Sequence, residues 1–225
     1  MPTATKIQTM NNFPENIISV VAGSGNTCIN IITALLRHDA TVIVPVKSYD
    51  EILSLEKITV DAMSGELVPV LADIPDHHRA SALFEDMEGR FGQINLTIIV
   101  FDNDYSDDLL TETPYEEWER MQRDSISAYF IVGKVILEFM KRNAQGIYRN
   151  AHGIYIAVSD TFSCDSTKIS PLTVIAMHMQ AALSKIFEEE VKYTGIKYYH
   201  VFAEDFSMQD GNYDVARYII DLCTT

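Results

Sequence analysis

Short apolar runs that alternate with segments of helical length constrain the fold of this chain more than any other feature. The first run, 16–23, is rich in β-branched residues and ends in glycine, and the next segment, 26–40, has an apolar face with helical spacing. The pattern repeats, with further strands predicted at 41–46, 66–73, 95–101, 153–159 and 197–203. Strands that are apolar on both faces and alternate with helices are typical of a parallel sheet with helices on both sides. The sequence therefore predicts a doubly wound α/β sheet.

Two of the predicted helices are longer than the rest. One spans 114–144, with Pro114 near its start, where a missing backbone N–H costs little, and the other spans 173–192. No repeat, low-complexity tract or Pro/Gly-rich linker divides the sequence. With 225 residues and 47% hydrophobic content, the chain is long enough for one large core and too short for two. We therefore expect one domain over 1–225.

Composition and cysteine spacing limit the partners and the cellular compartment that we expect for this protein. A formal net charge of -15 repels phosphate backbones and anionic lipid, so nucleic acid and membranes are poor partner choices. The first residues lack the basic start and apolar run of a secretion signal, and no apolar run reaches the roughly 20 residues that span a bilayer. The three cysteines are widely spaced and indicate neither a disulfide framework nor a zinc site. We expect a cytoplasmic protein without a metal.

Several sequence segments, taken with the order of elements, resemble one known family. They are VVAGSGNTCI, VLADI, RFGQINLTIIVFDND and GIKYYHVFAED, together with the spacing of Trp118, Phe130 and Met140. Over residues 16–222 the chain resembles the short-chain dehydrogenase/reductase family. The resemblance implies a Rossmann-type fold, an NAD or NADP cofactor, chemistry on carbonyl/alcohol pairs, and dimers or tetramers. Nearly every diagnostic motif of the family is nevertheless altered in this chain.

The turn between the first strand and helix is the first altered motif. A dinucleotide fold needs glycines here so that the backbone can approach the pyrophosphate at the helix N-terminus. Gly23 and Gly25 are present, but Cys28 replaces the third glycine of the general pattern, and Ile29 stands where the family has its last glycine. Gly23 and Gly25 are candidates for cofactor binding. A plain strand-to-helix turn that needs glycine explains them equally well.

Lys47, Asp73 and Ile74 are the other candidates for cofactor contacts. The second strand ends in Pro45–Ser48 without an acid to bind a ribose diol, so the resemblance favours NADP over NAD, with the 2′-phosphate near Lys47. Asp73 and Ile74 match the family's pair at the adenine, although Asp73 also suits a helix cap and Lys47 a solvated strand end. Phe101 replaces a small residue along the cofactor and is expected to place its ring toward the nicotinamide site. Loss of cofactor binding is the remaining alternative.

The catalytic positions are altered most. In the family a tyrosine donates the proton, and a lysine one helical turn later lowers the pKa of that tyrosine. The resemblance places Ala176 and Gln180 at these two positions. Ser159 matches the serine that orients the substrate carbonyl, and Ser125 replaces the supporting asparagine. Ser159 is thus the one retained catalytic candidate.

Three other features imitate catalytic or metal-binding motifs. Tyr193 and Lys197 fit the spacing Y-x-x-x-K, but Gly195 places them in the turn from helix to strand. His178 lies about 200° around its helix from position 176 and should point away from any site there. The acids of 101–108 are consecutive loop residues, which are usually solvated and do not bind a metal.

The segment after the last predicted strand is short compared with the family. The substrate-covering insertion is largely absent, which would leave a pocket open to water and disfavour hydride transfer. The leading hypothesis is a relative without conventional oxidoreductase activity that acts as a binding or assembly subunit. It would form a homodimer or homo-oligomer through helices 114–144 and 173–192, or a hetero-oligomer with an active relative. The alternatives are an NADP-dependent oxidoreductase with a displaced proton donor, and a nucleotide or metabolite sensor.

Overall fold

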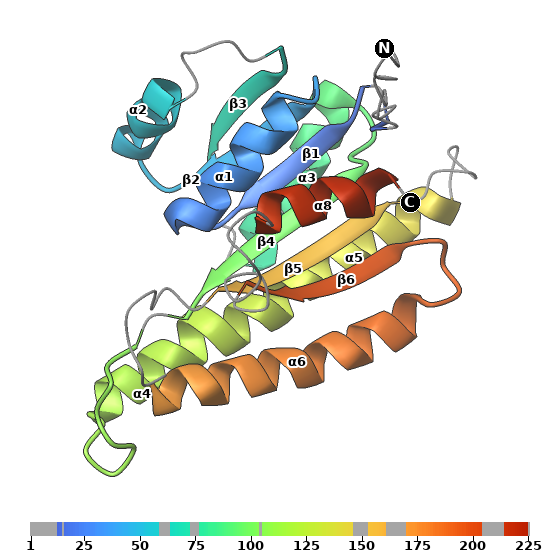
Figure 1. The fold of residues 1–225 in the computed structure, drawn as a ribbon. Helices are drawn as coiled ribbons and strands as arrows, with labels where there is room; N and C mark the ends of the chain where they lie inside the picture. The colour runs from blue at the N-terminus through green and yellow to red at the C-terminus, as the bar shows by residue number, and fades with distance from the viewer. Residues whose placement is uncertain are drawn as a thin grey trace, which may run out of the picture.

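A six-stranded parallel sheet forms the centre of the molecule (Figure 1). The computed structural model describes residues 13–14, 16–58, 64–72, 77–103, 105–145, 153–160, 170–203 and 214–224. The strands are β1 (Ile18–Ala22), β2 (Thr41–Val46), β3 (Glu66–Leu71), β4 (Leu96–Asp102), β5 (Ile154–Asp160) and β6 (Lys197–Phe202). Their order is β3-β2-β1-β4-β5-β6, so the direction of winding reverses between β1 and β4. In sheets of this kind, ligands bind beyond the carboxyl ends of the strands at that reversal.

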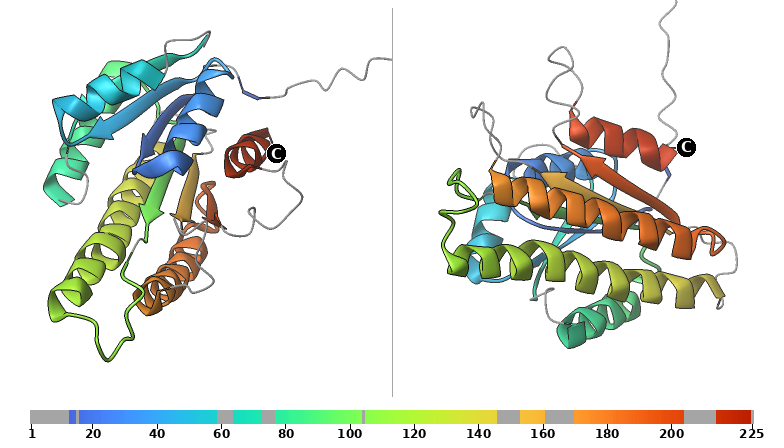
Figure 2. Two further views of the ribbon diagram at one scale, coloured as in Figure 1. Left: turned by 60° about the vertical axis from the view of Figure 1, so that its left-hand side comes forward. Right: turned by 90° about the horizontal axis from the view of Figure 1, so that it is seen from below.

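Helices cover both faces of the sheet (Figure 2). One face packs against α1 (Gly25–Leu36), α2 (Tyr49–Ile58) and α8 (Val215–Thr224), and the other against α3 (His77–Phe91), α5 (Ala128–Gln145) and α6 (Pro171–Val191). Alternate residues of each strand enter the two apolar clusters. In β5, Tyr155 and Ala157 join the cluster under α5, whereas Ile156 and Val158 join the cluster under α1. This double burial explains the continuous apolar strand sequences and confirms the predicted doubly wound sheet.

The long helix predicted over 114–144 contains a π-helical segment. α4 (Tyr115–Met121) passes into η1 (Gln122–Ser127) and then directly into α5. Within η1, Ser125 is buried. Such π segments are rare and often occur at functional sites. The apolar pattern continues across η1 with ordinary helical spacing, so the sequence predicted a single regular helix.

The last described element is helix α8, which packs on α1. Within the described residues no strand follows β6, which leaves β6 at one edge of the sheet and β3 at the other. In the same part of the chain, no helix is both long enough and apolar enough to cross a bilayer.

Candidate functional site

A buried polar network lies where β4 and β5 end, at the positions that the resemblance assigns to catalysis. Ser159 stands at the end of β5 beside Gln180 of α6, and both side chains are completely buried. Asn103 follows β4 directly, Ser125 comes from η1, and Tyr105 comes from the loop between β4 and α4. Asn103 and Ser125 are each 1% exposed, so water has little access to this network. None of the five side chains carries a charge at neutral pH.

The five side chains are joined by a continuous series of hydrogen bonds. Ser159 Oγ lies 2.6 Å from Gln180 Oε1, and the amide groups of Gln180 and Asn103 bond each other reciprocally at 3.1 and 3.3 Å. Ser125 Oγ lies 2.8 Å from Asn103 Oδ1, and the Tyr105 hydroxyl lies 2.5 Å from Ser125 Oγ. Both polar atoms of Gln180 therefore have protein partners.

The orientation of the Asn103 amide fixes the direction of these bonds. Asn103 Nδ2 lies 3.4 Å from a backbone carbonyl oxygen, which can only accept, so Nδ2 is the donor and Oδ1 the acceptor. Ser125 must then donate to Asn103 Oδ1 and accept from the Tyr105 hydroxyl. Ser159 in turn donates to Gln180 Oε1, which also accepts from Asn103 Nδ2. Because a hydroxyl has one hydrogen, Ser159 has no hydrogen left for another acceptor.

His200 of β6 closes the network on its other side. Its Nε2 atom lies 2.8 Å from Ser159 Oγ, and because the Ser159 hydrogen is already donated to Gln180, the His200 Nε2–H must be the donor. Burial lowers the pKa of His200 to about 4, so the ring is neutral at pH 7. A nucleophilic serine needs the opposite arrangement, in which its hydroxyl donates to a basic imidazole nitrogen. The pair of Ser159 and His200 is therefore not arranged as a nucleophile and base.

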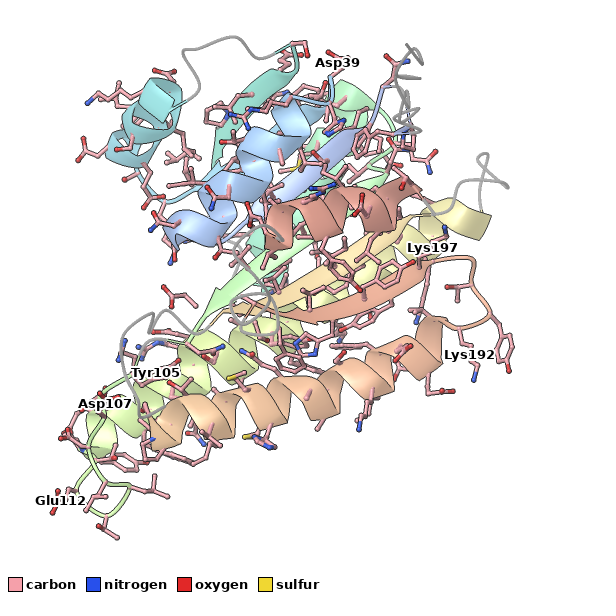
Figure 3. The ribbon with its side chains drawn as sticks, in the orientation of Figure 1. Asp39, Tyr105, Asp107, Glu112, Lys192 and Lys197 are labelled. Carbon is pink, nitrogen blue, oxygen red and sulfur yellow. The ribbon has the colours of Figure 1, made fainter. Side chains whose placement is uncertain are left out.

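The aromatic ring beside position 176 comes from Tyr105. Ala176 is completely buried and shares an apolar cluster with Tyr105, Met121 and Leu172. Figure 3 shows Tyr105 at the end of the molecule where α4 and α6 begin. Burial raises the pKa of Tyr105, so its hydroxyl is a weaker acid than free tyrosine, in contrast to the lowered pKa that the family's reaction requires. The hydroxyl also bonds Ser125, so it is separated from the retained serine by the rest of the network.

The glycine turn after β1 is shaped by its contact with β4. Gly23 has φ +139°, and a Cβ atom there would lie 2.5 Å from the Val100 carbonyl oxygen. Gly25 also has a positive φ, of 79°. Cys28 is buried in the core, and burial raises the pKa of its thiol to about 12, while Ile29 is half-buried. Gly23 is thus required by packing, whether or not a phosphate binds there.

The carboxylate of Glu51 lies at the end of β2, although β2 itself contains no acidic residue. Glu51 of α2 accepts a hydrogen bond from the Lys47 backbone N–H at 2.9 Å, and the Glu51 N–H donates to Ser48 Oγ at 3.3 Å. The S-x-x-E spacing of Ser48 and Glu51 is a helix-capping signal that identifies this contact in the sequence. Lys47 itself is exposed. Sequence reasoning considered only the strand tip and therefore missed Glu51.

The remaining cofactor candidates lie elsewhere. Asp73 and Ile74 fall outside the described residues. Phe101 is 6% exposed, and the centre of its ring lies 4.7 Å from that of Tyr129, so it is a residue of the core under α5. Phe101 contacts the polar network only through its backbone carbonyl oxygen, which accepts from Asn103 Nδ2 at 3.4 Å, while its ring packs in the core.

Two of the three imitating motifs, the Tyr193 and Lys197 pair and His178, are placed as the sequence predicted. Tyr193 is 91% exposed in the turn after α6, while Lys197 begins β6, so the two do not share a helix face. His178 is exposed, and its Nδ1 atom lies 2.8 Å from the Val174 carbonyl oxygen. In the described part of the chain, no group of three or more His, Cys, Asp or Glu side chains is arranged to hold a metal ion.

Comparison with solved structures matches this architecture to one fold. A short-chain dehydrogenase from Mycobacterium smegmatis superposes with a TM-score of 0.74 at 13% identity, over 94% of this chain and 87% of that one. A metagenomic short-chain oxidoreductase solved with NADP gives 0.70 at 15% identity, over 93% and 90% of the two chains. An L-sorbose reductase from Gluconobacter frateurii, solved with NADPH and L-sorbose, gives 0.65 at 15% identity, over 83% and 68%. The chain has the short-chain dehydrogenase/reductase fold. No family model and no curated protein matches its sequence.

The polar network contains residues at the positions that the sequence resemblance assigns to catalysis. Ala176 and Gln180 are both buried, one helical turn apart on α6; Gln180 bonds Ser159 at the end of β5, whereas Ala176 packs against Tyr105 and Met121. Of the network's members, sequence comparison identified Ser159, Gln180 and Ser125. Asn103, Tyr105 and His200 were missed because their contacts join segments far apart in the chain. The available signal was that Asn103 directly follows one strand and Ser159 lies at the end of the neighbouring parallel strand, and the carboxyl ends of such strands must meet.

Proposed function

We propose that this chain is a short-chain dehydrogenase/reductase-fold protein without conventional oxidoreductase activity, acting as a binding or assembly subunit. The observation that carries the proposal is the closed, uncharged network at the catalytic positions. Carbonyl reduction needs a proton donor with a tuned pKa beside the hydride acceptor. Ala176 has no proton to give, and Gln180 has no charge to lower a neighbouring pKa. The Tyr105 proton is directed to Ser125, inside the protein.

The cofactor positions support the same proposal. A bound nicotinamide cofactor would supply the hydride, and Gly23, Gly25 and Lys47 are the described residues that would hold its phosphates. Against them, the Glu51 carboxylate stands at the end of β2, where it would repel a 2′-phosphate. The amide of Gln180, at the position of the family's lysine, is bonded to protein partners through both polar atoms. These residues do not fit a tightly held NADP, and the proposed role does not require one.

An exposed apolar surface on α5 and α6 supports the assembly role. These helices lie side by side (Figure 2), with the Phe130 and Phe187 rings stacked at 6.3 Å. Gly133 permits this close packing, because a Cβ atom there would lie 2.8 Å from the Phe187 ring. Phe130 is nevertheless 46% exposed, and Met179 and Ile186 of α6 are 42% and 56% exposed. Grouped apolar side chains of this kind mark protein interaction sites. We assign this surface to pairing with a second copy or with an active relative.

A titration with NADPH and NADH tests the loss of the reaction. Cofactor fluorescence and thermal stabilisation report binding, since a ligand that binds only the folded state raises its apparent stability. The proposal predicts no stabilisation up to millimolar cofactor and no oxidation of NADPH with a panel of aldehydes and ketones. Turnover of any panel member would overturn it. Saturable binding without turnover would instead favour the nucleotide-sensor alternative.

Light scattering tests the assembly role. The wild-type protein at tens of micromolar is expected to be at least a dimer, and Ile186→Glu is expected to weaken that association by placing a charge in the interface. Leu53→Glu is the matched control, because Leu53 is 54% exposed on α2, away from α5 and α6. A monomeric wild type, or equal effects of the two variants, would contradict the assignment.

A further inference from the structure

The two edge strands of the sheet differ in their protection against pairing with another strand. β3 carries Pro69 near its centre and Glu66 at its start, and proline and charge are the features that keep edge strands from adding a neighbour. β6 has no proline, and its register with β5 runs without a bulge. Its only ionised side chain at neutral pH is Lys197, at its first position. Among the described residues, the β6 edge therefore lacks the features that protect the β3 edge from pairing.

The bonds to β5 determine which backbone groups of β6 face outward. The N–H groups of Lys197 and Ala203 donate to the carbonyl oxygens of Gly153, just before β5, and of Ser159 in β5, at 2.9 and 3.0 Å. Because backbone direction alternates along a strand, Tyr198, His200 and Phe202 direct their N–H and C=O groups to the open side. Within the part of the chain that the structure describes, no strand pairs with that side.

We propose that β6 pairs antiparallel with β6 of a second copy, across a twofold axis at His200, to join the two sheets into one. In an antiparallel ladder, residues of a hydrogen-bonded pair exchange both N–H···O bonds. With the axis at His200, the two copies of His200 form such a pair, and Tyr198 of each copy pairs with Phe202 of the other. This register satisfies the outward N–H and C=O groups of all three residues.

The side chains of β6 favour its own copy as the partner. On the face toward α6, this register places Tyr198 opposite Phe202 and His200 opposite His200, so aromatic rings meet aromatic rings. On the other face it places Tyr199 opposite Val201. Aromatic and β-branched pairs of these kinds stabilise antiparallel strands, whereas like charges directly opposite would destabilise them. Lys197 falls opposite Ala203, so the register sets no like charges against each other.

The edge is also held in a fixed shape before pairing. The His200 ring bonds Ser159 Oγ and lies 4.4 Å from the Phe202 ring, centre to centre. A strand whose side chains are already ordered loses little further freedom when it associates. This inference does not depend on the lost reaction, and it uses a different surface from the one on α5 and α6.

Hydrogen exchange resolved by residue in NMR tests the pairing without any mutation. In a monomer, the amides of Tyr198, His200 and Phe202 face solvent and exchange quickly, whereas those of Tyr199 and Val201 are bonded to β5 and exchange slowly. The proposal predicts that protection of the three outward amides rises with protein concentration. Fast exchange at every concentration would overturn it. Protection that does not depend on concentration would also overturn it, because it would indicate a partner strand from the same chain.

A matched pair of variants tests the backbone contribution by sedimentation. Phe202→Pro and Phe202→Ala both remove the ring, but only proline removes the outward N–H, and the bonds to β5 remain in both. In an Ile186→Glu background, which isolates this contact, we expect Phe202→Pro to associate about tenfold more weakly than Phe202→Ala. Equal association of the two variants, with matching thermal stability, would overturn the proposal. If the surface on α5 and α6 is not an interface, Ile186→Glu alone will leave the association of the protein unchanged. That result is distinct from a failure of the β6 pairing.

Discussion

The glycine turn after β1 and the polar network after β4 and β5 lie at the same carboxyl edge of the sheet, yet they differ in what they retain from the resembling family. The turn keeps Gly23 and Gly25. At the network, Ala176 and Gln180 stand at the positions matched to the family's tyrosine and lysine. Gly23 is required by its contact with Val100, a requirement that holds without any ligand. No such backbone clash constrains the positions matched to the family's tyrosine and lysine, and here Gln180 bonds Ser159 and Asn103 instead. A retained motif residue is therefore weak evidence of a retained ligand when packing alone explains it.

The largest expected effect is at the turn. Gly23→Ala forces a Cβ atom to within 2.5 Å of the Val100 carbonyl oxygen at a φ of +139°, which should lower the free energy of unfolding by about 4 kcal/mol. Gly89→Ala is the control. Gly89 lies within α3 with no atom within 4 Å of its added Cβ, so alanine should stabilise the protein by about 0.5–1 kcal/mol. Chemical denaturation measures both. Equal small effects would mean that packing does not require the glycine.

Gln180→Lys is the next test, because it restores the family's residue to the network. An ammonium group among uncharged, buried partners should cost about 3 kcal/mol of unfolding free energy at pH 7. Burial would lower the pKa of the new lysine below its unfolded value, so the variant should regain stability as the pH rises toward 10. A variant as stable as the wild type at pH 7 would show that position 180 is open to solvent, as a working site requires.

The acid dependence of stability should report His200. The pKa of His200 is about 4 in the folded protein, below its unfolded value, so the folded state binds fewer protons. The contribution of His200 to the free energy of unfolding is complete above about pH 6.5 and is lost as the pH falls toward 4. The loss is at most about 3 kcal/mol, because partial solvent access reduces it. Comparing the wild type with His200→Asn in denaturant titrations isolates this contribution from the carboxylates. Parallel curves between pH 6.5 and 4 would contradict it.

The smallest effect is expected at the end of the network. Tyr105→Phe keeps the ring beside Ala176 and removes only the hydroxyl that donates to Ser125, so it should cost about 1 kcal/mol. Tyr115→Phe serves as the control, since Tyr115 is 68% exposed and should tolerate the change. If both variants match the wild type in thermal unfolding, the Tyr105 hydroxyl adds nothing to the stability of the network.

Sequence reasoning identified the sheet and its helices because their signals are local. Strand apolarity and helical spacing are set by neighbouring residues, and they placed all six strands. The π turn in η1 was missed because it changes backbone bonding without changing the apolar pattern. The site was predicted only in part, since alignment with the family reached Ser159 and Gln180 but not their partners. His200 and Asn103 meet Ser159 and Gln180 only through strand pairing, which no short stretch of sequence encodes.

The direction of the bond between His200 and Ser159 tests the central claim most directly. Nitrogen chemical shifts of the His200 ring, assigned by comparison with His200→Asn, identify which ring nitrogen carries the proton and how the ring titrates. The account predicts a neutral ring protonated at Nε2 that stays neutral down to about pH 4, with Ser159 donating to Gln180. A ring protonated at Nδ1, titrating near its ordinary pKa, would contradict the account, because Ser159 would then donate to a basic imidazole and the network would be an activated site.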